Sequence, residues 1–280
     1  MSRIKKAARK YCHTPLYKSA YNRAVFTLGG LVVMEIRMGF RQFFTWKYPL
    51  RSLIRTIAVL LSALTRLLLG RSLKYSYAFA GEDRIIEALL KPIITRPGFY
   101  VDVGCNHPKL FSNSYGLYRK GWQGICIDAN QALIDLYGLY RPRDKAIADL
   151  VSDGDEERDF YHIQNDVLST TETDGLEEYK REGLSMEIHR LKPRRLTEIL
   201  DALQAPADFD LLSIDAEEHD LQVLRSLDLD AYRPKLIVVE DEGFDPLSPG
   251  QNEIYRYLSG SGYRLEGYVL KNLYFTRRLQ

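Results

Sequence analysis

The sequence has few cysteines, no long uninterrupted apolar run and almost no acid in its first quarter. Its three cysteines, Cys12, Cys105 and Cys126, are too few for a disulfide scaffold, which favours a reducing, cytosolic compartment. No apolar core with a small-residue cleavage site follows the basic start, so a secretory signal is not expected. The longest apolar stretches, 25–34 and 53–69, are interrupted by glycine or arginine and fall short of the roughly 20 residues that span a bilayer.

The shortage of acid is confined to residues 1–75, which hold 15 Lys and Arg but a single acid, Glu35. These residues carry a formal charge of +14. The rest of the chain has 24 Lys and Arg against 36 Asp and Glu, or −12, and the two values sum to the net +2. Such a split predicts two parts with different partners. We therefore expect a basic helical extension over residues 1–80 and a second domain over residues 81–280.

Segment 53–69 has the spacing of an amphipathic helix, with leucines and isoleucines on one side and Arg55 and Arg66 on the other. A cationic amphipathic helix preceded by aromatic residues, as at 40–48, is typical of a segment that lies in an anionic membrane interface. This would place the protein peripherally on the inner face of a membrane. Packing on the second domain or in a homo-oligomer is the alternative. Nucleic-acid binding is disfavoured because the basic residues form no recognisable RNA-binding motif.

From Gly81 onward the sequence alternates between helical spacing and short apolar strands. Such alternation predicts parallel βαβ units in a doubly wound, Rossmann-like α/β sheet. The final two strands have the pattern of a hairpin, and the acidic run 153–159 predicts a solvated turn. Helices are predicted over 82–90, 131–140, 196–203, 219–227 and 254–258, and strands over 99–103, 124–128, 145–149, 209–215, 235–240, 263–265 and 273–276.

Acidic residues lie at or just before the ends of five predicted strands. Ligands of an open α/β sheet bind beyond the carboxyl ends of its strands, so these acids predict a site. Clustered carboxylates repel one another, and a cationic ligand or a divalent metal would relieve that repulsion. The three-glycine dinucleotide fingerprint and the P-loop are both missing, and a single glycine, Gly104, follows the first strand. The acids are Asp102, Asp128, Asp149, Asp215 and Glu240.

Four segments of the second domain carry motifs in a fixed order. They are 99–108 (FYVDVGCNHP), 112–115 (SNSY), 121–130 (GWQGICIDAN) and 211–220 (LLSIDAEEHD), and the pattern continues through 224–227 and 233–240. In this order they resemble the FkbM-type S-adenosylmethionine-dependent methyltransferases. The resemblance covers about residues 81–278 and implies a seven-stranded methyltransferase sheet whose last strand is antiparallel. It also implies S-adenosylmethionine as the cofactor and a sugar or natural-product hydroxyl as the acceptor.

The resemblance assigns roles to the strand-end residues. It implies that Asp102, Gly104 and Asn106 line the methionine end of the cofactor, Asp128 the ribose and Asp149 the adenine side. From its position alone, Asp102 either holds a ligand ammonium or holds the loop itself. One departure affects the acceptor side. Where the family usually reads Asp-Val-Glu-Gly, this chain reads DAEE at 215–218, which changes the turn or the acceptor specificity there.

Methyl transfer to a hydroxyl requires alignment of acceptor, methyl group and sulfur, and removal of a proton. Either Asp215 or His219 acts as the general base, with a solvent-facing position at a helix N-terminus as the alternative for His219. In a second arrangement, Asp215, Glu217 and Glu240 hold Mg or Mn, which acidifies the acceptor hydroxyl. His107 either contacts the ligand or shapes its loop.

Two other classes of function stay open. The chain could be an RNA methyltransferase that uses its basic region as a nucleic-acid arm, or a cofactor-binding or oligomerisation module without catalysis. The acceptor would be selected by the insertion 153–193 and the basic cluster 190–195, which forms either an anion clamp or a solvated face. Our leading hypothesis is an O-methyltransferase that acts on a sugar hydroxyl of a glycan, glycolipid or natural product at a membrane surface.

Overall fold

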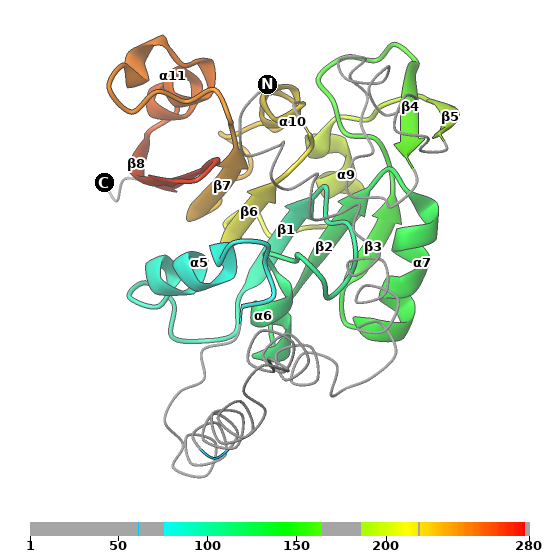
Figure 1. Ribbon diagram of the computed structural model, residues 1–280, viewed down its shortest axis with the longest axis horizontal. Helices are drawn as coiled ribbons and strands as arrows, with labels where there is room; N and C mark the ends of the chain where they lie inside the picture. The colour runs from blue at the N-terminus through cyan, green and yellow to red at the C-terminus, as the bar shows by residue number, and fades with distance from the viewer. Residues whose placement is uncertain (1–60, 62–75, 164–185, 218, 278–280) are drawn as a thin grey trace, which may run out of the picture. The chain divides into compact units, whose positions relative to one another are not determined.

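The computed structural model describes residues 61, 76–163, 186–217 and 219–277 of the 280-residue chain (Figure 1). The chain divides into two compact units, Met1–Tyr75 and Ser76–Gln280. Apart from Leu61, the predicted amphipathic segment and the aromatic residues before it lie outside the described residues. Within the described ranges, no helix combines the length and the apolar character needed to cross a membrane.

The second unit is built on a seven-stranded sheet with the order β3-β2-β1-β6-β7-β9-β8. Six of these strands run in one direction, and β9 runs antiparallel between β7 and β8. This confirms the predicted Rossmann-like sheet with an antiparallel last strand. The strands are β1 (Phe99–Val103), β2 (Gln123–Asp128), β3 (Lys145–Ala148), β6 (Leu211–Ile214), β7 (Leu236–Glu240), β8 (Tyr263–Val269) and β9 (Asn272–Arg277).

Helices cover both faces of this sheet. One core joins the sheet to α5 (Glu82–Leu90), α6 (Tyr115–Arg119) and α7 (Gln131–Tyr140). The other joins it to α9 (Leu196–Ala202), α10 (Asp220–Arg225) and α11 (Glu253–Gly260). Successive strand residues alternate between the two cores, as Tyr100 and Val101 do in β1. The central strands are apolar on both faces because both faces are buried.

Some elements were not predicted from the sequence. Strands β4 (Arg158–Ile163) and β5 (Met186–Leu191) pair antiparallel in a separate two-stranded sheet, within the region interpreted as an insertion. The acidic run 153–159 is therefore a turn only up to Glu157, because β4 begins at Arg158. Helix α6 and the 3-10 turn Pro249–Gln251 were also missed. Both are short, and short elements carry little periodicity.

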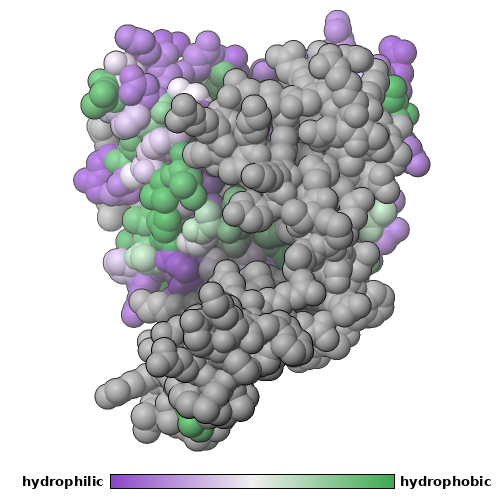
Figure 2. Space-filling model, viewed as in Figure 1, coloured by the Kyte–Doolittle hydropathy of each residue, from purple (hydrophilic) through white to green (hydrophobic). Residues whose placement is uncertain are grey.

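Apolar side chains remain at the surface of this unit. Figure 2 shows apolar groups, in green, gathered beside polar groups on the visible face. Val269 and Leu270, which are 41% and 55% exposed, lie at the tip of the β8–β9 hairpin. Two exposed apolar side chains therefore directly precede Lys271 in the chain.

Candidate active site

The turn after β1 lies directly against the end of β6. Gly104 has a left-handed φ of 72°, and a Cβ atom built on it would lie 1.8 Å from the carbonyl oxygen of Asp215. A glycine is needed here because any side chain would collide with that backbone. The amides of Gly104 and Cys105 both donate to the carbonyl of Ile127 in β2. The glycine turn therefore brings the ends of β1, β2 and β6 to one place.

Asp102 is buried beneath this turn. Its carboxylate accepts a hydrogen bond from the Ser114 hydroxyl, on the far side of the loop that follows β1. Burial raises the pKa of Asp102, whereas the Ser114 hydroxyl and the charge of Arg141 lower it. Of the two roles expected for Asp102, the structure supports holding the loop. A contact with a ligand ammonium stays a prediction.

Asp128 joins the loop after β1 to the start of α7. Its carboxylate accepts hydrogen bonds from the backbone amides of Asn106, at 2.8 Å, and Asn130, at 2.9 Å. Asn106 has a left-handed φ of 46°, and its Oδ1 accepts from the amide of His107. Both residues therefore lie where a cofactor was predicted, and their contacts with it stay predictions.

Asp149, which follows β3, forms an ion pair with Arg194 at 2.7 Å. Burial raises the pKa of Asp149, and the hydrogen bond and charge of Arg194 lower it. Arg195 donates to the backbone carbonyls of Asp153 and Arg225. These two arginines of the basic cluster therefore make internal contacts, in addition to being partly solvated. The proposed contact of Asp149 with adenine stays a prediction.

The two histidines near the strand ends are buried. Nδ1 of His107 accepts from the backbone amides of Lys109 and Leu110, both at 3.1 Å, so His107 shapes its own loop. His219 precedes α10 and is only 2% exposed, with its Nε2 2.9 Å from the hydroxyl of Ser152. The expectation that His219 faces solvent is wrong, because this contact ties α10 to the segment after β3. Its role as a general base stays a prediction.

Asp215 and Glu240 extend from the ends of the neighbouring strands β6 and β7. Burial raises the pKa of Glu240, and the charge of Asp215 and a hydrogen bond to it raise the pKa further. Oδ1 of Asp215 and Oε2 of Glu240 are buried, and no hydrogen-bond donor among the described residues reaches either atom. Two neighbouring carboxyl groups repel each other when both are charged, so this pair favours a positive group beside it.

Lys271 provides positive charge at this acidic site. It lies in the turn between β8 and β9 and forms an ion pair with Glu240. Burial by itself would lower the pKa of Lys271, but the charges of Asp215, Glu240 and Glu217 raise it. Lys271 was not predicted as a site residue, because one lysine in a hairpin turn forms no motif.

The predicted metal site does not fit this arrangement well. Within the part of the chain that the structure describes, no three or more His, Cys, Asp or Glu side chains are grouped to hold a metal ion. Glu240 contacts Lys271, and Glu217 lies in a turn with a left-handed φ of 49°. Glu218, which replaces the usual family glycine, lies outside the described residues. Binding of Mg or Mn by Asp215, Glu217 and Glu240 stays a prediction that this geometry does not favour.

Asp220, the first residue of α10, is a further buried acid of this region. One of its carboxylate oxygens accepts a hydrogen bond from the amide of Ala216 at 3.0 Å. Burial and the charge of Asp215 raise its pKa to about 7. The motif that contains Asp220 was recognised in the sequence, but its burial was not foreseeable without the packing of α10.

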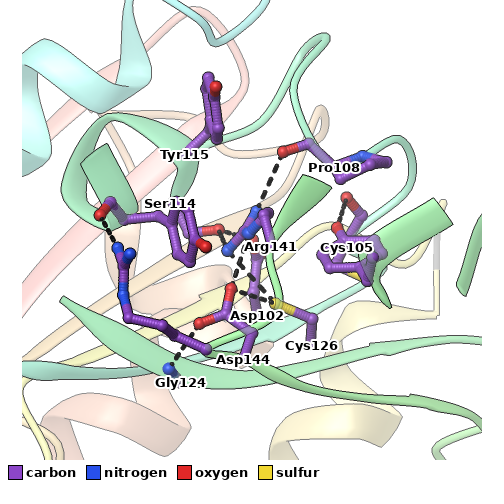
Figure 3. A network of polar contacts seen from close by, with 12 residues as sticks. Asp102, Cys105, Pro108, Ser114, Tyr115, Gly124, Cys126, Arg141 and Asp144 are labelled. Atoms are coloured by element: carbon purple, nitrogen blue, oxygen red, sulfur yellow. Dashed lines mark hydrogen bonds and ion pairs between the residues drawn. The ribbon is translucent and has the colours of Figure 1, made fainter. Parts of the chain in front are cut away.

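A fully buried arginine, Arg141, lies behind the loop that follows β1 (Figure 3). It pairs with Asp144, its Nε lying 2.6 Å from Oδ2, and neither side chain is exposed. The rings of Tyr100, Tyr118 and Tyr137 surround its guanidinium at 5.0–5.4 Å. Sequence reasoning gave Arg141 no role, because nothing in a segment with several charged residues marks one of them as buried.

The order of the seven strands, with the glycine turn and the acids at their carboxyl ends, defines a Rossmann-like methyltransferase. The family model described as the methyltransferase FkbM domain matches residues 102–265, which is more than half of the chain. The chain therefore belongs to the FkbM methyltransferase family and is an S-adenosylmethionine-dependent methyltransferase.

Several solved structures are similar to this chain at low sequence identity. A TehB-like SAM-dependent methyltransferase from Corynebacterium glutamicum is 16% identical over 78% of this chain and 96% of its own, with a TM-score of 0.38. A Pyrococcus horikoshii protein suggested to be an RNA methyltransferase is 10% identical over 73% and 88%, with a TM-score of 0.38. Monomeric WbdD is 17% identical over 74% of this chain but 43% of its own, with a TM-score of 0.39. A comparison with curated proteins gave no significant match.

Proposed function

We propose that this methyltransferase transfers a methyl group to a hydroxyl of a sugar-containing acceptor. The observation that carries the proposal is the position of Asp215, whose backbone lies against Gly104 of the predicted cofactor turn. A hydroxyl that is methylated must lose its proton, and a carboxylate beside the cofactor is placed to accept it. The neighbouring Glu240 and Lys271 set the charge around that carboxylate.

Each part of the site has one task in this scheme. Bound S-adenosylmethionine would supply an electrophilic methyl group on a positively charged sulfur. The turn at Gly104–Asn106 would hold the methionine end, and Asp128 and Asp149 would hold the ribose and the adenine. Asp215 orients the acceptor hydroxyl and takes its proton.

The charge of the site favours a sugar over a nucleic acid. Four acids lie near one another after β6 and β7, and Lys271 forms an ion pair with one of them, Glu240. The acids are Asp215, Glu217, Asp220 and Glu240. Lys271, the cation described here, is already paired with Glu240, whereas RNA-binding surfaces neutralise phosphates with several lysines and arginines. Hydroxyl groups of a sugar can donate hydrogen bonds to the same carboxylates. An RNA acceptor is therefore the less favoured alternative.

We also infer that the basic region 1–75 holds the enzyme on an anionic membrane, where a lipid-linked sugar would be available. Its charge of +14, against −12 for the rest of the chain, supports this inference. Basic residues near an anionic surface contribute about 1 kcal/mol each. The alternative, packing within a homo-oligomer, predicts a concentration-dependent molecular mass instead.

The test is release of S-adenosylhomocysteine by the full-length chain with a panel of glycans and lipid-linked saccharides, and with RNA in parallel. We expect a saccharide to be methylated, and Asp215→Ala to lower kcat by about 100-fold or more, since general bases contribute roughly 10²–10⁴-fold. Asp208→Ala is the matched control, because Asp208 is an exposed acid just before the other end of β6. Full activity of Asp215→Ala, or methylation of RNA alone, would contradict the proposal. A chelator arm measures whether Mg or Mn is needed.

A further inference from the structure

The guanidinium of Arg141 contacts the cofactor loop, 104–114, at three places. Its Nη2 donates to the Ser114 hydroxyl at 2.9 Å, and its Nη1 donates to the Ser112 hydroxyl at 3.2 Å and the Pro108 carbonyl at 3.4 Å. In Figure 3 the guanidinium lies among Ser114, Pro108, Cys126 and Asp144. One buried side chain thus joins the middle and the end of the loop.

The contact with Ser114 continues to the strand beneath the loop. Ser114 accepts a hydrogen bond from Arg141 and donates its own to Asp102 of β1. At the start of the same loop, the hydroxyl of Tyr137 donates to the carbonyl of Cys105 at 3.0 Å. Tyr137 and Arg141 are four positions apart at the end of α7. The end of this helix therefore holds both the beginning and the end of the loop.

Arg141 is costly to bury, and packing alone does not explain it. Its charge is balanced by Asp144, which also accepts from the hydroxyl of Tyr100 and the amide of Gly124. Buried ion pairs are often no more stabilising than apolar side chains of similar volume. A guanidinium does offer five donors in a fixed plane, which an apolar side chain cannot. Most of those donors bind acceptors in the loop, and Nε binds Asp144.

We propose that Arg141 is a positioning residue that fixes loop 104–114 in the shape that receives S-adenosylmethionine, acting through Ser112, Ser114 and the carbonyl of Pro108. The proposal rests on the proposed placement of the cofactor at Gly104–Asn106. A loop held in its bound shape before binding loses less conformational entropy when the ligand arrives. Arg141 therefore contributes to cofactor affinity without touching the cofactor.

The test is calorimetric titration of the full-length chain with S-adenosylhomocysteine. Arg141→Lys keeps a positive charge beside Asp144 but loses the planar set of donors. We expect its Kd to rise about 10- to 100-fold, as for loss of one or two hydrogen bonds to a charged group. KM for the cofactor should rise in parallel, with kcat at saturating cofactor within about threefold of the parent. A Kd within twofold of the parent overturns the proposal.

Arg143→Lys is the matched control. Arg143 lies two positions along the chain, is exposed, and donates to the carbonyl of Tyr118 rather than to the loop. Its Kd should equal that of the parent, and an equal rise in both variants would overturn the proposal.

Ser114→Ala provides a second variant that leaves the Arg141–Asp144 pair in place, in case Arg141→Lys fails to fold. We expect it to weaken binding, and the double variant to bind little worse than Arg141→Lys alone, because both changes break one chain of contacts. Parent-like binding by Ser114→Ala overturns the proposal. If the parent chain itself does not bind S-adenosylhomocysteine, the proposed cofactor site at Gly104–Asn106 is wrong. If the parent binds and both variants bind equally well, only the role of Arg141 fails.

Discussion

At the scale of single residues, the acids of this site were predictable and the cations that accompany them were not. Asp128, Asp215 and Glu240 lie at strand ends, and strand ends follow from the apolar pattern of the sequence. Arg141 and Lys271 lie in loops, where no periodicity shows which lysine or arginine turns inward. Lys271 also lies beyond residues 102–265, which the family model matches.

The predicted ribose contact of Asp128 is testable through the cofactor. Asp128→Ala removes the carboxylate that holds the amides of Asn106 and Asn130. We expect binding of S-adenosylhomocysteine to weaken by about 10-fold or more, since hydrogen bonds to charged groups are worth about 1.5–3 kcal/mol. Asp128→Asn, which keeps one acceptor oxygen, should lose less. Unchanged affinity of Asp128→Ala by calorimetry would remove Asp128 from the cofactor site.

The raised pKa of Asp220 makes the stability of the protein depend on pH. Its folded-state pKa of about 7 lies above the ordinary value of 3.8. A carboxyl group of this kind contributes stability below the unfolded value, and that contribution is lost as the pH rises through the folded value. Asp220→Asn cannot ionise, so it should become more stable than the parent between about pH 4 and pH 8. The gain is at most about 4 kcal/mol, from roughly 1.4 kcal/mol for each pKa unit.

Urea unfolding of the two proteins at a series of pH values checks this prediction. The difference in unfolding free energy should be small near pH 4 and largest above pH 7. A difference that does not change with pH would mean that Asp220 is not held protonated.

At the scale of elements, the alternation of strands and helices was predictable and the short additions were not. The predicted bounds of α5, β1 and α7 agree with the structure. Each of these elements buries apolar residues at the spacing typical of its secondary structure, which the sequence shows directly. Strand β6 begins at Leu211 rather than at residue 209, and α10 ends at Arg225 rather than at residue 227. Strands β4 and β5 pair only with each other, outside the main sheet, so the alternation of strands and helices that predicts the main sheet does not reveal them.

The turn between β6 and α10 contains backbone strain that can be measured. Glu217 has a left-handed φ, which costs a residue other than glycine about 1–2 kcal/mol. Glu217→Gly should therefore raise the unfolding free energy by about 1 kcal/mol. Glu217→Ala is the control, because it removes the same charge but keeps the Cβ atom. Equal unfolding midpoints in urea for both variants would show that charge, and not backbone strain, controls stability at this turn.

At the scale of the whole molecule, the charge is divided between two units of opposite sign. Residues 1–75 carry +14, and they lie almost entirely outside the described residues, so their attachment to a membrane stays a proposal. The sequence could predict this division because charge is read directly from composition. It could not predict what the basic unit contacts, since an amphipathic helix suits a membrane and a protein surface alike.

Co-sedimentation of the full-length chain with vesicles tests the membrane proposal. We expect recovery with vesicles rich in anionic lipid at low salt, and a large loss of binding at about 1 M salt, where the Debye length is about 3 Å. Neutral vesicles serve as the control. Equal recovery with anionic and neutral vesicles, or none with either, would contradict the proposal.

The position of Lys271 has a consequence for biosynthesis. Strands β8 and β9 follow every other strand of the main sheet in chain order, and the turn between them carries this lysine to the end of β7. During translation, Asp215 and Glu240 therefore emerge from the ribosome before the ammonium group that accompanies them. A nascent domain must wait for its final hairpin before these acids acquire their partner. The proton-accepting side of the site would then mature after the cofactor loop, and a ribosome-stalled chain that stops before β8 should bind S-adenosylhomocysteine more readily than it catalyses methyl transfer.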